Sequence, residues 1–115
     1  MATFFGFALA DSMFNGDVAI QRRSLTVEAV RELVEAGVVP CLNPSHVATI
    51  TAMEVRYGLH VEIPAKAPQV SLQVGDSVIV MGVRGLPRLD ATRHEYTEEE
   101  IASATFTFSQ YTVLG

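Results

Sequence analysis

The sequence predicts one α/β domain, spanning residues 1–115, with a mixed β-sheet of about five strands flanked by helices. Strand-like apolar runs and helical patterns alternate along the chain, and the helical patterns carry their own start and stop residues. A composition of 49% hydrophobic and 18% charged residues is that of a chain with a packed core. Because so few charges are available to cover the surface, part of the apolar excess is expected in the interface of a homodimer.

The N-terminal segment predicts two strands joined by a turn-prone loop. Thr3 to Leu9 is rich in aromatic residues and suits a buried strand. The loop from Asp11 to Asp17 contains Asn15-Gly16, a pair typical of turns. A second, short strand is predicted at Val18 to Ile20.

Two helices with a strand between them come next. Thr26 is a favoured N-cap and Gly37 a favoured C-cap, so they bound the first helix. Val38 to Leu42 is a short apolar strand that leads directly into the second helix. Asn43 suits the N-cap of that helix, and Pro44 suits its first position because a missing N–H costs nothing there.

The C-terminal half predicts the rest of the sheet. Leu59 to Leu72 is extended chain interrupted by prolines, which belongs at a sheet edge or a bulge. Val78 to Val83 is an apolar, β-branched run suited to a central strand. Thr97 and Glu100 form a capping box for a short helix. Thr105 to Val113 alternates Thr and Phe before the pattern fails, which predicts a last strand with a bulge.

Charge and composition exclude several classes of partner. A net charge of −5 argues against a protein that grips duplex nucleic acid, but it leaves a small nucleotide ligand open. The apolar first ten residues have no basic leader and are too short to cross a bilayer, so no membrane partner is expected. The single cysteine suits a reducing compartment, and we expect a cytoplasmic protein.

The start of the second helix is the most informative stretch for function. Ser45 and His46 lie in its expected first turn, beside unpaired backbone N–H groups and the positive end of the helix dipole. Such a place holds an anion such as phosphate, and a histidine there can exchange a proton with it. The alternative is a surface or cap-completing histidine. Neither a metal site nor a cofactor motif is indicated.

Two other segments can complete an anion site at this end of the sheet. Arg84 and Arg88 flank Gly85-Leu86-Pro87, a stiff turn, and arginine suits the stabilisation of extra charge on a phosphate. The loop after the first strand offers polar side chains. If the first strand and the 38–42 strand are neighbours, their C-terminal ends deliver both segments to one edge.

The succession of these motifs resembles the viral ring nucleases, a family of type III anti-CRISPR proteins with relatives in phages and bacteria. The resemblance rests on a short first strand, then a strand followed by Ser45-His46-Val47-Ala48-Thr49 opening a helix. It continues with an Arg-Leu-Pro-like loop at 84–88 before a Thr-x-Glu-Glu-Ile helix at residues 97–101. The match covers most of the chain in order and approximate spacing.

The resemblance implies a homodimer that cleaves cyclic tetra-adenylate, a cyclic oligoadenylate second messenger, without a metal. A ribose 2′-hydroxyl attacks the adjacent phosphorus, His46 protonates the leaving 5′-oxygen, and an arginine, Arg84 or Arg88, holds the phosphate. We expect the remaining ligand contacts from polar side chains near the strand ends: Asp11, Ser12, Asn15, Asn43, Ser45 and Thr49.

Three positions depart from the family pattern. Asp11 stands where relatives often carry Asn, Ala48 where they carry serine, and Asp90 is the nearest counterpart of an acidic residue after the arginine loop. Two rival functions stay open: a sponge that sequesters the cyclic nucleotide uncut, and a viral dimer with a structural or partner-binding role.

Overall fold

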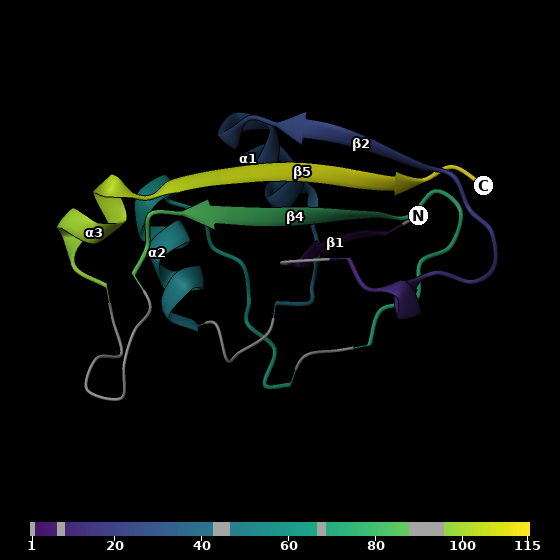
Figure 1. Cartoon of the computed structure of the whole chain (residues 1–115), viewed down its shortest axis with the longest axis horizontal. Coiled ribbons are helices and arrows are strands. Elements are labelled where there is room, and N and C mark those ends of the chain that lie inside the picture. The colour runs from purple at the N-terminus through teal and green to yellow at the C-terminus, as the bar shows by residue number, and fades with distance from the viewer. Residues whose placement is uncertain (1, 7–8, 43–46, 67–68, 88–95) are drawn as a thin grey trace.

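The structure, a computed structural model, describes residues 2–6, 9–42, 47–66, 69–87 and 96–115 (Figure 1). The described ranges form a five-stranded mixed sheet with helices packed on it, as the sequence predicts. In chain order the elements are β1 (Thr3–Gly6), the short 3-10 helix η1 (Asp11–Met13), β2 (Ile20–Leu25), α1 (Val27–Ala36), β3 (Val39–Pro40), α2 (Val47–Tyr57), β4 (Ser77–Arg84), α3 (Glu98–Ser103) and β5 (Thr105–Val113).

The strands lie in the order β2-β5-β4-β1-β3. The strand β1 runs parallel to both of its neighbours, with Phe5 opposite Pro40 of β3 and Ile79 of β4. The long strand β5 runs antiparallel to β4 and β2 and joins the two parts of the sheet. The sheet is therefore parallel on the β1 side and antiparallel on the β5 side.

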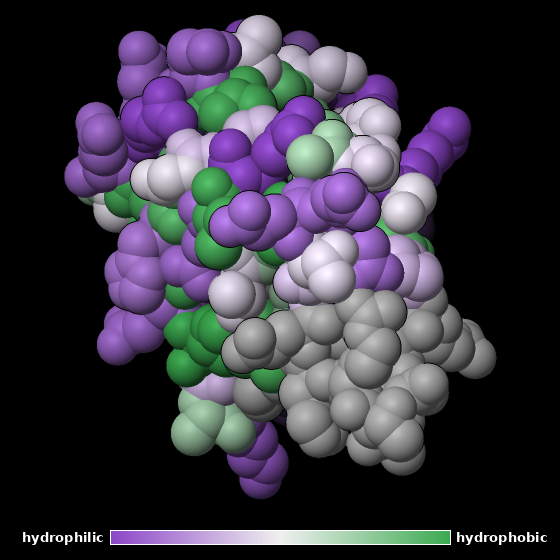
Figure 2. All heavy atoms as spheres, turned by 90° about the vertical axis from the view of Figure 1, so that its left-hand side faces the viewer, coloured by the Kyte–Doolittle hydropathy of each residue, from purple (hydrophilic) through white to green (hydrophobic). Residues whose placement is uncertain are grey.

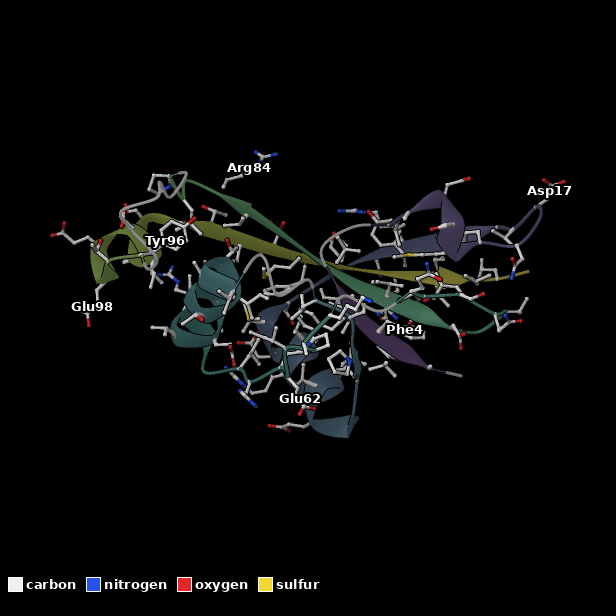
Figure 3. All side chains as sticks on the ribbon, turned by 90° about the horizontal axis from the view of Figure 1, so that it is seen from below. Phe4, Asp17, Glu62, Arg84, Tyr96 and Glu98 are labelled. Atoms are coloured by element: carbon white, nitrogen blue, oxygen red, sulfur yellow. The ribbon has the colours of Figure 1, made fainter. Side chains whose placement is uncertain are left out.

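The two faces of the sheet are covered differently. On one face, Phe5, Ile79 and Phe108 pack against buried side chains of all three α-helices. On the other face, Val78 and Val113 pack against segments without α-helix, around η1 and residues 70–72. Figure 3 shows the helices on one side of the sheet and η1 on the other. A site beside the sheet is thus walled by helices on one face and by loops on the other.

Local sequence signals set the helix ends. The hydroxyl of Thr26 accepts a 3.1 Å hydrogen bond from the Ala29 N–H, and Gly37 closes α1. The Thr97 hydroxyl accepts from the Glu100 N–H while the Glu100 carboxylate accepts from the Thr97 N–H, which confirms the predicted capping box. The helix α2 ends at Tyr57, before Gly58, and its predicted start at 43–46 lies outside the described residues.

Two strand predictions are wrong in detail. The second strand covers Ile20–Leu25 instead of Val18 to Ile20, because β5 offers a full antiparallel partner to this polar, exposed edge segment. The last strand has no bulge: Thr105 to Thr112 pair with β4 in one unbroken register. Gln110, where the alternation of the sequence fails, donates a 2.9 Å hydrogen bond to the Ser77 hydroxyl and so has a partner inside the sheet.

In the described part of the chain, no helix has the length and apolar character needed to cross a membrane.

Candidate functional site

The parallel strands direct three segments to one edge of the sheet, the one formed by the C-terminal ends of these strands. Because β1, β3 and β4 run in the same direction, the chain leaves all three from the same edge. The segment after β1 leads to η1, the one after β3 leads into α2, and β4 itself ends at Arg84. The first strand and the strand within the 38–42 segment are neighbours, which meets the condition for a shared edge.

Cys41, which directly follows β3, is hydrogen-bonded to β1 through both its backbone and its side chain. The Cys41 N–H donates a 3.0 Å hydrogen bond to the Phe5 carbonyl, and the Cys41 thiol donates to the same oxygen at 3.1 Å. A Cβ added at Gly6 would lie 3.1 Å from the Cys41 sulfur, so glycine suits this position. Burial raises the pKa of the Cys41 thiol, against a smaller lowering by the Phe5 bond, so the group stays protonated at neutral pH.

The helix α2 is anchored on the sheet with its N-terminal end near this edge. Ile50 and Met53 are fully buried in the core shared with Phe5 and Ile79. Thr49 is half-buried in the first turn of the described helix. The predicted site residues Asn43, Ser45 and His46 lie outside the described residues. What the structure gives is the frame on either side of them, β3 and α2.

Arg84 is exposed at the end of β4, opposite Thr105 of β5. Side chains alternate along a strand, so Arg84 shares the face of Val80 and Gly82, away from the buried helices (Figure 3). Gly85 follows with a φ of +88°, and a Cβ there would lie 3.3 Å from the Ser103 carbonyl oxygen. Arg84 is therefore held at a defined turn, whereas Arg88 lies outside the described residues.

The loop after β1 folds back over the sheet. The Leu72 N–H donates a 2.7 Å hydrogen bond to the Met13 carbonyl, and the Asn15 amide donates to the Ser71 hydroxyl at 3.3 Å. Ser12 lines a hollow of about 470 Å³ together with Gln69 and Ser71.

Gln69 and Ser71 were not among the residues that the sequence singled out. Their only signal is the proline-interrupted extended stretch from Leu59 to Leu72, which does not reveal its partner. Asp11 is exposed as the first residue of η1.

The predicted site residues therefore fall into separate groups. Figures 1 and 3 place η1 toward the end of the sheet where β4 begins, and Arg84 at the end where β4 finishes. The structure brings Ser12 and Asn15 to residues 69–71, and it does not bring them to Arg84. The two groups therefore lie toward opposite ends of β4.

Metal ligands do not gather in the described ranges: no three side chains of His, Cys, Asp or Glu come together there. His60, the one histidine in those ranges, is an exposed residue whose Nδ1 lies 2.8 Å from the Glu54 carboxylate.

Comparison with known proteins gives a likeness in fold. No family model and no curated protein matches the sequence. Among solved structures, the chain is similar to B116 of Sulfolobus turreted icosahedral virus, with a TM-score of 0.67 and 15% sequence identity. The superposition covers 97% of this chain and 99% of B116. The chain thus has the fold of a viral protein over nearly the whole length of both molecules.

Proposed function

We propose that this protein is a homodimeric, metal-independent ring nuclease that binds and cleaves cyclic tetra-adenylate in a pocket between two copies. In the host cytoplasm, that activity counteracts type III CRISPR signalling. The observation that carries the proposal is the parallel arrangement of β1, β3 and β4, because the chain leaves β3 toward the His46 motif at the same end of the sheet where β4 reaches Arg84. The order of the sequence motifs and the fold likeness to the viral B116 support it.

The proposed reaction needs the ligand, the protein and solvent water. A ribose 2′-hydroxyl loses its proton to water as its oxygen forms a bond to the adjacent phosphorus, while the bond from phosphorus to the 5′-oxygen breaks. His46 gives its proton to the leaving 5′-oxygen, and Arg84 or Arg88 stabilises the charge on the phosphoryl oxygens. The products are a 2′,3′-cyclic phosphate and a 5′-hydroxyl.

A second copy is part of this proposal for a reason of symmetry. A ring of four identical nucleotides can present equivalent phosphodiesters to both members of a two-fold dimer. Each copy then supplies one His46 and one arginine to the same ligand. A sheet edge of a single chain offers only one such set.

The test is incubation of the purified protein with labelled cyclic tetra-adenylate in the presence of a chelator. Linear products that end in a 2′,3′-cyclic phosphate are expected. Recovery of intact ligand from a tight complex would instead assign the chain as a sponge. That alternative has one observation in its favour: Ala48 in α2 offers no hydroxyl to a phosphate where relatives carry serine. If no cyclic oligoadenylate changes the melting temperature, both nucleotide functions fail.

A further inference from the structure

A second hollow lies on the helical side of the molecule, between α2 and α3. It has a volume of about 350 Å³ and opens between the α2 face from Val47 to Val55 and the side chains of Tyr96, Glu98 and Ile101. Figure 3 shows Tyr96 between the two helices. Figure 2 faces this end of the molecule and shows hydrophobic side chains at the surface among hydrophilic ones. A hollow of this volume is within the range of small-molecule sites.

The two walls of this α2–α3 hollow belong to helices that contact each other directly. The Arg56 guanidinium, near the end of α2, donates a 3.1 Å hydrogen bond to the Ala102 carbonyl of α3. Ile101 is buried in the same core as Ile50 of α2. The hollow is therefore formed by the packing of α2 against α3.

The walls combine apolar surface with a few polar groups. Ala48 and Ala52 leave room because their side chains are small, and Ile101 adds apolar surface. Tyr96, a half-buried residue, contributes an aromatic side chain. Thr51, Tyr96 and Glu98 are the residues with polar side chains among those that line the hollow. A flat, mainly apolar molecule with a few hydrogen-bonding groups suits such walls.

Charge decides which part of a nucleotide suits this hollow. Among the described residues, no lysine or arginine lines the hollow, whereas Glu98, whose side chain is acidic, does. A phosphate would be repelled by that carboxylate. A neutral base with an exocyclic amine would donate a hydrogen bond to it.

We propose that the α2–α3 hollow is a base subsite for adenine, which stacks on Tyr96 and donates from its exocyclic amine to Glu98. The inference rests on the proposed function for the identity of the base, since the ligand proposed there is an oligoadenylate. Val47, which lines the hollow, directly follows His46 in the chain. A base in the hollow would therefore contact the residue that directly follows His46 in the sequence.

The test compares two mononucleotides by NMR titration of the whole protein. Adenosine monophosphate carries the exocyclic amine, and inosine monophosphate carries a carbonyl oxygen in its place. Adenosine monophosphate is expected to shift the backbone amides of Ala52 and Ile101 and to bind about fivefold more tightly than the inosine form.

Matched variants assign that preference to Glu98. Glu98→Gln is expected to abolish the preference, because the Gln side chain can donate to the inosine carbonyl as well as accept from the amine. Glu99→Gln makes the same charge change at an exposed neighbour in the same helical turn and should keep the preference. Tyr96→Phe should keep binding, whereas Tyr96→Leu should weaken it about tenfold by removing the stacking surface.

The subsite proposal would be overturned by any of three results. These are equal affinity of the wild type for the two nucleotides, equal effects of the two Gln variants, and NMR shifts confined to other surfaces. The same variants are assayed for cleavage of cyclic tetra-adenylate. If the wild type does not cleave the ring but shows the Glu98-dependent preference, the ring nuclease fails and the subsite stands. If the wild type cleaves the ring and Glu98→Gln leaves its KM unchanged, the subsite fails and the nuclease stands.

Discussion

Asp76 ties the N-terminal end of the chain to the turn before β4. Its Oδ1 accepts a 2.8 Å hydrogen bond from the Ala2 N–H, and its Oδ2 accepts a 2.9 Å bond from the Gln73 N–H. The residue is only 8% exposed, so these two hydrogen bonds face little competition from water. Asp76 thereby fixes where β1 enters the sheet beside β4.

This arrangement predicts an acid-sensitive contribution to stability. The Ala2 and then the Gln73 hydrogen bond lower the pKa of Asp76 below its ordinary value of 3.8. The stabilisation is therefore complete above that ordinary pKa and is lost as the pH falls through the lower, folded pKa. We expect the free energy of unfolding of the wild type in urea to fall more steeply below about pH 4 than that of Asp76→Asn. At pH 7, Asp76→Ala should cost about 1–3 kcal/mol. If the free energies of unfolding of wild type and Asp76→Asn change with pH by the same amount, Asp76 is not the source of the acid sensitivity.

Phe108 is the aromatic centre of the helical core. Its ring packs edge-to-face on Phe5 at 6.4 Å and on Tyr57 at 5.9 Å between ring centres, and it is 3% exposed. Phe108→Ala should destabilise the protein by about 3–5 kcal/mol through a cavity under α2. Phe108→Leu fills most of that volume and should cost clearly less. Chemical denaturation of both variants checks the order, and equal losses would contradict it.

Gly82 and Thr107 face each other on the sheet surface that the helices leave uncovered. A Cβ added at Gly82 would lie 2.6 Å from the Thr107 hydroxyl oxygen, so one side chain must move. Gly82→Val is expected to lower stability by about 1–3 kcal/mol. In a Thr107→Ala background, Gly82→Val should lower stability much less, because the hydroxyl that the new side chain would meet is absent. A double-mutant cycle measures the coupling, and additive losses would show that the contact is not the cause.

His46 carries the proposed chemistry, so His46→Ala should reduce cleavage of cyclic tetra-adenylate about 100-fold or more. Binding of the intact ring should persist, because the lost group acts mainly on the leaving oxygen. Circular dichroism and the melting temperature serve as controls for folding. Unchanged turnover in this variant would rule out the proposed mechanism.

Arg84 and Arg88 compete for one role in the proposed site. The structure places Arg84 at the strand end, held by the turn at Gly85, while Arg88 lies outside the described residues. The alanine variant of the arginine that contacts the phosphate should lose kcat strongly, and the other should change KM or nothing. Single-turnover assays of Arg84→Ala and Arg88→Ala, side by side, decide between them. If both retain full activity, neither arginine stabilises the reaction.

Local chemistry made much of the fold predictable from the sequence. Thr26 with Gly37 and Thr97 with Glu100 mark helix ends through bonds between residues at most a few positions apart, so sequence spacing is enough to find them. The run around Ile79 identifies a central strand because only a buried strand suits so many consecutive β-branched residues.

Contacts between segments that are distant in the sequence are specified only by the tertiary structure. The polar strand at Arg22 has no apolar alternation, and it exists because β5 pairs with it. The partnership of Asn15 with Ser71 joins residues 56 positions apart, which no local pattern encodes. The hollow beside Tyr96 likewise depends on how two helices pack. Interactions between near neighbours in the chain specify the helix ends, the central strand and the His46 motif, so these are accessible from the sequence alone. The separation of Arg84 from Ser12 results from packing between residues distant in the sequence, and so do the walls of both hollows. Only the folded chain specifies that packing.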